Sequence, residues 1–240
     1  MADTPFKNDP QGGLEPYSPF VTEQRAGSGK PLSLRGYSLA LTGLVLLGFV
    51  VMGACASLFT NVGFLLWIYD KFTLVTILSF VGAIAGILMM GRAKSSQSVG
   101  LSLVGYAVFV LSFGFTTSTV LLMYTAQTIS NAFLATAGIV AVFACLGVAF
   151  PKAFQRIQGI LFFALIGLIL AEVIMMFMGV DQTWIDFAVI IVFCGFIGFD
   201  FYRAMQDEPT LVNAVFNASN LFLDIINVFI RVLSIFGRRD

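Results

Sequence analysis

Three carboxylates stand within long apolar stretches of this 240-residue chain, at Glu172, Asp200 and Asp224. A charge at the centre of a lipid bilayer costs at least about 2.5–3.5 kcal/mol. Acidic residues in such places therefore point to proton transfer, ion binding or a paired electrostatic contact. The structural alternative is a protonated carboxyl group that hydrogen-bonds between packed helices, and Glu172 is the first candidate for it.

The last apolar segment, residues 211–235, carries polar side chains at helical spacing. They are Asn213, Asn217, Asn220, Asp224, Asn227 and Arg231. At 100° per residue, these positions fall within a stripe about 80° wide on one helix. Lipid does not tolerate such a face, so the stripe must look into a helical bundle or toward water. We expect this helix to be central, with the stripe and Glu172 as pathway-lining candidates.

Asp200 ends the preceding apolar segment, 24 residues before Asp224. If the two carboxyl groups face one another in a low-dielectric site, both cannot ionise cheaply, so they would share a proton. Loss of that proton would create a doubly negative site whose hard oxygen ligands suit Ca²⁺. Arg92, at the end of another apolar segment, could compete as a counter-charge. The chain has no histidine, so we expect these three residues to form any pH switch and ion gate.

The composition identifies the surroundings of these groups. Hydrophobic residues make up 58% and charged residues 11% of the chain, against roughly 45–50% and about 25% in soluble domains. The 13 basic residues equal the 13 acidic ones, and 26 Phe would aggregate in water. A soluble enzyme, a nucleic-acid binder and a disordered regulator are thereby excluded. An integral membrane protein, with the lipid bilayer as its first partner, is indicated.

Gaps between the charges place the membrane spans, each of which needs about 20 apolar residues. We predict an all-α, polytopic membrane protein with seven transmembrane helices. The predicted segments are 37–59, 73–91, 99–122, 131–150, 158–178, 185–204 and 211–235. Residues 1–36 hold five of the seven prolines and no apolar run, so we expect a disordered tail there. The transmembrane domain would then cover residues 37–240.

Lys and Arg predict the orientation, because cytoplasmic loops carry an excess of them. The tail and the second, fourth and sixth loops hold nine, whereas the first, third and fifth loops hold only Lys71. We therefore expect a multi-pass protein of the inner cell membrane with a cytoplasmic N-terminus. A seventh full span would put Arg238 and Arg239 outside. Either that segment is partly re-entrant, or the nine charges outweigh the two.

The motifs around the two aspartates are similar to those of a known family. Residues 218–237, ASNLFLDIINVFIRVLSIFG, resemble the final helix of the bacterial branch of the Bax inhibitor-1 family, also called the transmembrane Bax inhibitor motif family. Residues 198–203, GFDFYR, resemble the family's Y-D motif near the end of helix six. The resemblance implies six helices around a central seventh. It also implies a pH-regulated Ca²⁺ leak, with Asp200 and Asp224 as the sensor and Arg92 as their basic partner.

The chain departs from the family pattern at three positions. Phe199 and Phe222 replace tyrosines, which removes two hydrogen-bond donors, and Glu172 stands where an uncharged residue is expected. We interpret Glu172 as a third titrating group or as a group that tunes selectivity.

The leading hypothesis is a passive, pH-sensitive Ca²⁺ leak channel without cofactor or catalytic residue. The alternative is an interaction protein that modulates a membrane-anchored ATP-dependent protease or a stress or cell-death pathway. The resemblance suggests the protease role, because bacterial relatives in the family include modulators of such a protease. An intramembrane aspartyl protease typically carries a Y-D motif on one helix, a G-x-G-D motif on the next helix, and a later P-A-L motif. Here Phe199 precedes Asp200 and no such motif follows, so we expect no enzyme.

Overall fold

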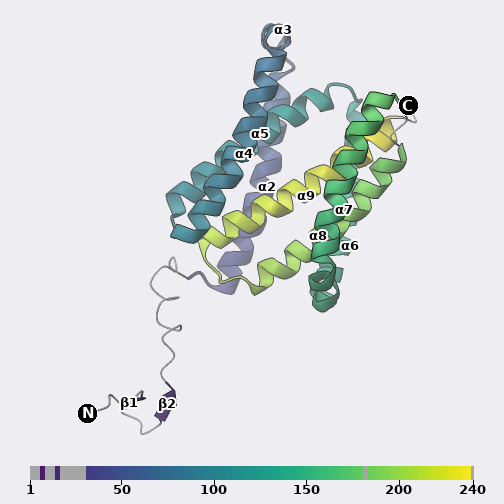
Figure 1. Ribbon diagram of the computed structural model, residues 1–240. Helices are drawn as coiled ribbons and strands as arrows, with labels where there is room; N and C mark the ends of the chain where they lie inside the picture. Colours follow the sequence, from purple (N-terminus) through teal and green to yellow (C-terminus); the bar gives the residue numbers. More distant parts are fainter. Residues whose placement is uncertain (1–5, 9–13, 17–30, 181–182, 239–240) are drawn as a thin grey trace.

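The computed structural model describes residues 6–8, 14–16, 31–180 and 183–238, and within them seven helices are long and apolar enough to cross a membrane (Figure 1). These helices are α2 (Leu34–Leu58), α4 (Phe72–Ser96), α5 (Val99–Leu121), α6 (Ala126–Ala149), α7 (Pro151–Met178), α8 (Thr183–Gln206) and α9 (Leu211–Gly237). Each contains a window with a mean hydropathy of at least 1.7. The predicted all-α architecture with seven spans is confirmed.

Helix α6 begins at Ala126 rather than at Asn131, where the sequence predicts its start. The Thr125 side chain accepts a hydrogen bond of 3.2 Å from the backbone N–H of Thr128, which caps the helix. Gln127 then donates to the side-chain oxygen of Asn131 at 2.9 Å, one turn further on. The polar residues of this region therefore form the first turns of the helix instead of separating two helices.

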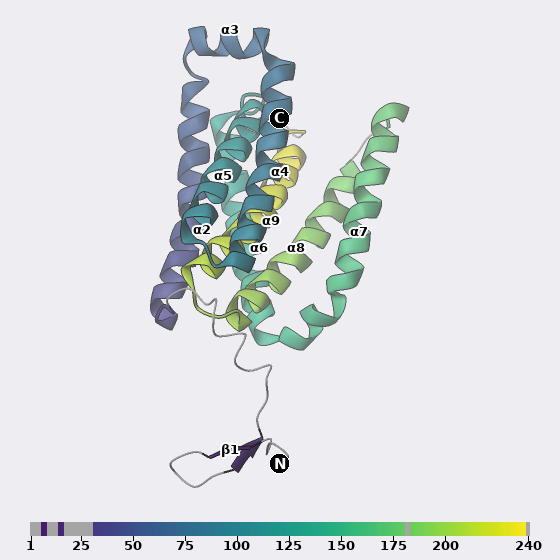
Figure 2. The same cartoon turned by 60° about the vertical axis from the view of Figure 1, so that its left-hand side comes forward.

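The connection between α2 and α4 contains a further helix, α3 (Val62–Asp70), where the sequence predicts a loop. The side chain of Asn61 caps it by accepting a hydrogen bond from the Phe64 backbone N–H. Figure 2 shows α3 lying across the ends of α2 and α4. Helix α7 also starts earlier than the predicted residue 158, because Pro151 fits the first position of a helix.

Part of the predicted tail has regular structure. Two short strands, β1 (Phe6–Asn8) and β2 (Leu14–Pro16), pair antiparallel, and the backbone N–H of Leu32 donates to the carbonyl of Pro209 at 2.7 Å. Helix α2 then begins at Leu34. Main-chain hydrogen bonds need no apolar side chains, which is why composition does not predict these pairings. The rest of the predicted disordered tail lies outside the described residues.

Helix α9 is the central element of the bundle. It packs against α2, α4, α5, α6 and α8, and Figures 1 and 2 show it crossing the middle of the molecule at a slant. Helix α7 packs chiefly on α8, with a smaller contact on α6. The predicted central seventh helix is thus confirmed, although α7 stands on the outer side of α8. We refer to the end of the bundle where α9 begins as the Leu211 end, and to the opposite end as the Gly237 end.

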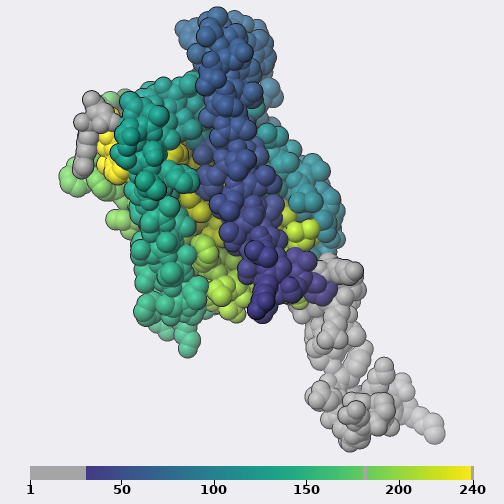
Figure 3. Space-filling view, turned by 180° about the vertical axis from the view of Figure 1, so that it is seen from behind, coloured from purple at the N-terminus to yellow at the C-terminus, as the bar shows by residue number. Residues whose placement is uncertain are grey.

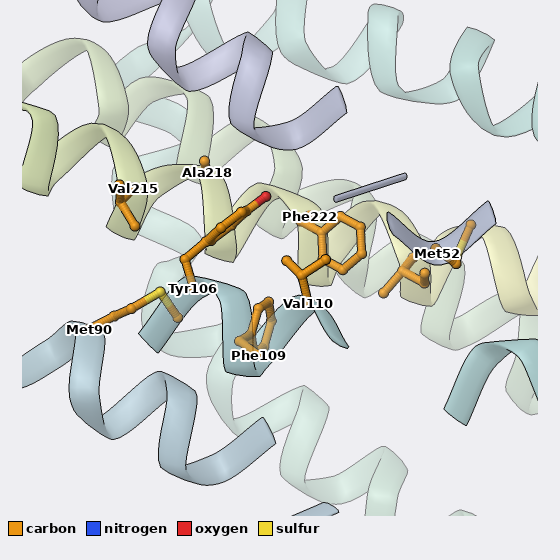
Figure 4. Packing of buried hydrophobic residues seen from close by; sticks show 9 residues of the cluster. Met52, Met90, Tyr106, Phe109, Val110, Val215, Ala218 and Phe222 are labelled. Carbon is orange, nitrogen blue, oxygen red and sulfur yellow. The ribbon is translucent and has the colours of Figure 1, made fainter. Parts of the chain in front are cut away.

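The core around α9 is made of large apolar side chains from four helices (Figure 4). Phe109 of α5 and Phe222 of α9 are fully buried, with ring centroids 6.1 Å apart. The hydroxyl of Tyr106 donates a hydrogen bond to the carbonyl of Leu44 on α2. Figure 4 shows Tyr106 and Phe109 lying between the α9 ribbon and α5. This packing fixes the depth at which α9 sits relative to its neighbours.

Two close helix contacts depend on glycine. A Cβ on Gly86 of α4 would lie 2.7 Å from the carbonyl oxygen of Gly105 on α5. A Cβ on Gly147 of α6 would lie 2.9 Å from the Cα of Gly198 on α8. Small residues allow such backbone approach in membranes. The second contact holds the part of α8 that carries Asp200 close to α6.

Candidate functional site

The two carboxylates that the sequence singles out are brought together between α8 and α9. Asp200 and Asp224 are each 5% exposed, and their carboxyl groups hydrogen-bond to one another. The second carboxyl oxygen of Asp224, Oδ2, is buried and has no hydrogen-bond partner among the described residues. The helices are antiparallel neighbours joined by residues 207–210, so positions 24 apart in sequence reach the same depth. The arrangement is a buried carboxyl pair that needs a proton for its mutual hydrogen bond.

Arg203 is the cation beside this pair. It lies one turn after Asp200 on α8, with its Nη2 atom 3.2 Å from Oδ1 of Asp200. Its guanidinium also lies over the rings of Phe199 and Phe216, at 5.6 Å and 5.7 Å from their centroids. Arg92, the predicted basic partner, is exposed near the Leu211 end of α4. Among the described residues, Arg203 rather than Arg92 is the cation in contact with the pair, because residues three apart on one helix are neighbours in space.

The aspartate pair forms part of the wall of a cavity of about 610 Å³ between α7, α8 and α9. Four phenylalanines line much of the cavity, at positions 162, 193, 196 and 199. Its polar wall consists of Gln158, Arg203, Asn220 and the two aspartates. The side-chain nitrogen of Asn220 is buried and has no hydrogen-bond partner in the part of the chain that the structure describes. The cavity therefore brings unsatisfied polar groups together inside an otherwise apolar chamber.

A second polar cluster closes the Leu211 end. Lys94 of α4 donates to Oδ2 of Asp207 at 2.8 Å, and Asn217 of α9 donates to the same oxygen at 2.8 Å. Asn217 also donates to the hydroxyl of Tyr37 on α2 at 2.9 Å. Burial raises the pKa of Asp207, but these two hydrogen bonds and the charges of Lys94 and Arg203 outweigh it and hold the pKa below its ordinary value. The cluster joins α2, α4 and α9 through one ionised carboxylate.

Two of the predicted pathway-lining asparagines bond to backbone instead. Asn213 donates to the carbonyl of Glu208 at 2.9 Å, and its own N–H is capped by Thr210. Asn227 donates to the carbonyl of Leu223, one turn earlier on α9, at 2.7 Å. Asn213 thus stabilises the start of α9, and Asn227 satisfies its amide within its own helix. Neither lines the cavity.

A third polar cluster lies at the Gly237 end. Arg231 of α9 forms ion pairs with Glu172 of α7 and with Asp186 of α8, the latter at 3.0 Å. Arg238 reaches the other oxygen of Asp186 at 3.0 Å, and Ser234 donates to that oxygen at 3.1 Å. Glu172 is therefore an ion-pair partner of the stripe and does not face the cavity. Two acids and two arginines balance in this cluster.

Seven residues of these clusters were not among the predicted site residues. They are Tyr37, Lys94, Asp186, Arg203, Asp207, Ser234 and Arg238. Asp186 carries a signal that could have been used, because it is an acidic residue in the first turn of an apolar segment. Arg203 and Lys94 act as topology markers in the sequence, and only their depth in the bundle reveals their partners.

A Ca²⁺ ion prefers six to eight oxygen ligands. In the part of the chain that the structure describes, no group of three or more His, Cys, Asp and Glu residues is placed to hold a metal ion. The pair Asp200 and Asp224 supplies only two carboxylate groups, so water molecules would have to complete the coordination shell of a Ca²⁺ ion. This donor set suits a passing ion better than a resident one.

Comparisons with known proteins identify membrane proteins that are similar to this chain. The family described as "Inhibitor of apoptosis-promoting Bax1" matches residues 33–240. The inner membrane protein YbhL of Escherichia coli K12 is 26% identical over 93% of this chain and 98% of its own length. An uncharacterized membrane protein of Streptococcus pyogenes serotype M3 is 30% identical over 62% of this chain and 68% of its own. Bax inhibitor 1 of Schizosaccharomyces pombe is 28% identical over 63% of this chain and 58% of its own.

The family match extends over all seven spans and both aspartates. The chain is therefore a multi-pass membrane protein that belongs to the Bax inhibitor-1 family.

Proposed function

We propose that this protein is a passive leak pathway for Ca²⁺ across the inner membrane, gated by protonation of Asp200 and Asp224. The observation that carries the proposal is the buried hydrogen bond between these two carboxyl groups at the wall of the cavity. The activity involves no catalysis and no cofactor, and Ca²⁺ is its cargo. The N-terminus and the Leu211 end face the cytoplasm in this proposal, as the distribution of Lys and Arg favours.

The gating follows from the charges. A hydrogen bond between two carboxyl groups requires one proton, and with that proton bound the pair carries one negative charge opposite Arg203. When the proton leaves, two carboxylates face one another with a single cation, and their repulsion favours separation of α8 and α9. The separated pair offers oxygen ligands to a divalent cation. Flux should therefore rise with pH.

The two flanking clusters act as closures in this proposal. Toward the Leu211 end, the contact of Lys94 with Asp207 joins α4 to the chain between α8 and α9. Toward the Gly237 end, Arg231 ties α9 to α7 and α8. In this proposal, an ion that crosses the protein passes both clusters. Separation of α8 from α9 loosens both at once, because each cluster contains a residue of α9 and an acid on or next to α8.

The test is Ca²⁺ flux into liposomes that contain the purified protein, from about pH 5 to about pH 9. Wild-type flux should rise across this range, whereas Asp200→Asn and Asp224→Asn should each flatten the dependence. Asp70→Asn is the matched control, because Asp70 is exposed and pairs only with the adjacent Lys71 among the described residues. Flux from both pair variants that keeps the wild-type pH dependence would rule out the paired switch.

The second role considered for the chain, modulation of a membrane-anchored protease or of a stress pathway, depends on the resemblance alone. Copurification of membrane proteins with the full chain and with a variant lacking residues 1–30 would test it. Loss of a protease partner together with unchanged flux would show that the two roles are separate. No protease partner with either form would leave the leak as the function to pursue.

A further inference from the structure

A groove opens on the side of the bundle opposite the aspartate cavity. It has a volume of about 310 Å³ and lies between α2 and α6, which both pack on α9 but barely on each other. Figure 3 shows it as a hollow between the purple-blue α2 and the teal α6, in which lime-green atoms of α8 and yellow atoms of α9 are visible. The central helix is thus reached from the side of the molecule.

The lining of the groove is apolar. Its floor is Phe201 of α8 with Ile225 and Phe229 of α9. The α6 wall has alanines at 137, 141 and 144, which share one helix face, and their small side chains leave the space open. Of the lining residues that the structure describes, only Thr136 has a polar side chain. Such a groove offers water almost no hydrogen bonds.

One end of the groove is closed by aromatic rings. Phe49 of α2 and Phe133 of α6 meet edge to face, with centroids 6.0 Å apart. Phe133 is 48% exposed and continues the apolar outer surface of α6. The lining residues belong to the central turns of α2 and α6, within the hydrocarbon region of a bilayer. The groove is therefore continuous with the surface of the protein that faces lipid.

We propose that this groove is a binding site for one lipid acyl chain, which inserts between α2 and α6 and contacts the central helix. An unfilled groove would leave its walls without dispersion partners, and the acyl chains of the surrounding bilayer are at hand to supply them. The floor residues Phe201 and Ile225 directly follow Asp200 and Asp224 in sequence. A bound chain therefore supports the same turns of α8 and α9 that hold the carboxyl pair. The site is independent of whether the protein conducts Ca²⁺.

The test uses lipids with brominated acyl chains, which quench tryptophan on contact. In the full chain, Trp67 and Trp184 are replaced by Phe, and Phe201→Trp then places a probe on the groove floor. Phe163→Trp, at a position 74% exposed on α7, is the lipid-facing reference. Phe109→Trp, at a fully buried position, is the shielded reference. The acyl-chain site predicts a loss of fluorescence at position 201 close to that at position 163, and a loss as small as at position 109 would overturn it.

A second variant separates a bound chain from general lipid contact. Ala141→Phe should fill the groove and reduce quenching at position 201, without changing quenching at position 163. Val142→Phe is the matched control, because Val142 is 56% exposed on α6 and does not line the groove. If Phe201→Trp does not give a monodisperse protein, Ile225→Trp probes the same floor. Equal quenching with and without Ala141→Phe would also contradict the site.

Discussion

The aspartate pair and the cluster at the Gly237 end both place acidic groups between α8 and α9, but their charges balance differently. At the Gly237 end, Glu172 and Asp186 meet two arginines, Arg231 and Arg238. At the pair, the two carboxyl groups have one cation beside them among the described residues, Arg203. In the balanced cluster each carboxylate has an arginine partner, so the cluster acts as a structural clamp. An unbalanced pair must hold a proton, so its stability depends on pH.

The largest expected effect is on the clamp. Arg231→Met should leave Glu172 and Asp186 facing one another with Arg238 as the remaining described cation near them. Removing one partner from a buried ion pair strands the other charge, so we expect a loss of about 3 kcal/mol in the free energy of unfolding. Chemical unfolding in detergent micelles measures it. The double variant Glu172→Leu with Arg231→Met should recover part of the loss, and a loss below about 1 kcal/mol in the single variant would show that the cluster is no clamp.

A smaller effect is expected at the pair. The hydrogen bond between the carboxyl groups of Asp200 and Asp224 needs one proton, so stability should fall as pH rises and that proton is lost. Asp224→Asn leaves one carboxylate opposite Arg203. The loss in free energy of unfolding between low and high pH should therefore be about 1.5 kcal/mol smaller in this variant than in wild type. Thermal unfolding in detergent across the pH series measures it. The comparison fails if wild type and Asp224→Asn lose stability in parallel.

Asp207 should respond to pH in the opposite sense. Its pKa in the folded protein lies below the ordinary value of 3.8. The stability that it provides is therefore fully present above pH 3.8 and is lost as pH falls through the lower, folded-state value. Asp207→Asn should cost about 1 kcal/mol at neutral pH, because Lys94 loses an ion pair that is only partly exposed.

The same thermal series, extended to acid, measures the Asp207 effect. The difference between wild type and Asp207→Asn should shrink at the lowest pH. Lys94→Met is the matched variant, since it removes the other partner of the same contact. A constant difference at every pH would mean that Asp207 contributes through packing rather than charge.

Helix periodicity predicted the central position of α9 and the meeting of the two aspartates. The polar stripe predicted α9 as the central helix, because all its members lie on one element and their angles follow from spacing alone. The meeting of Asp200 and Asp224 also followed, since a short connection makes α8 and α9 antiparallel neighbours. These inferences need only local geometry and the cost of charge in lipid.

The sequence did not predict the features that depend on how deep each helix lies in the bundle and on which neighbour each helix face meets. Arg92 and Lys94 are two residues apart, yet only Lys94 turns toward the chain between α8 and α9. Asp186 lies at the start of its segment, where an acid in the first helical turn is ordinary. The groove between α2 and α6 exists because two helices that touch α9 leave space between themselves. No pattern within one segment contains that information.

The smallest effect is expected at Arg92, and it sharpens the contrast between the two charge environments. Arg92 is exposed, so Arg92→Gln should change the free energy of unfolding by less than about 0.5 kcal/mol and leave the pH profile unchanged. Arg203→Gln, by contrast, removes the only cation that the described residues place on the carboxyl pair. The pair should then keep its proton to higher pH. Stability should therefore begin to fall at a higher pH in Arg203→Gln than in wild type. Thermal unfolding across the same pH series compares the two variants. If Arg92→Gln moved the profile and Arg203→Gln did not, the counter-charge of the pair would come from α4, and the contrast between an unbalanced pair and a balanced clamp would have to be redrawn around Arg92.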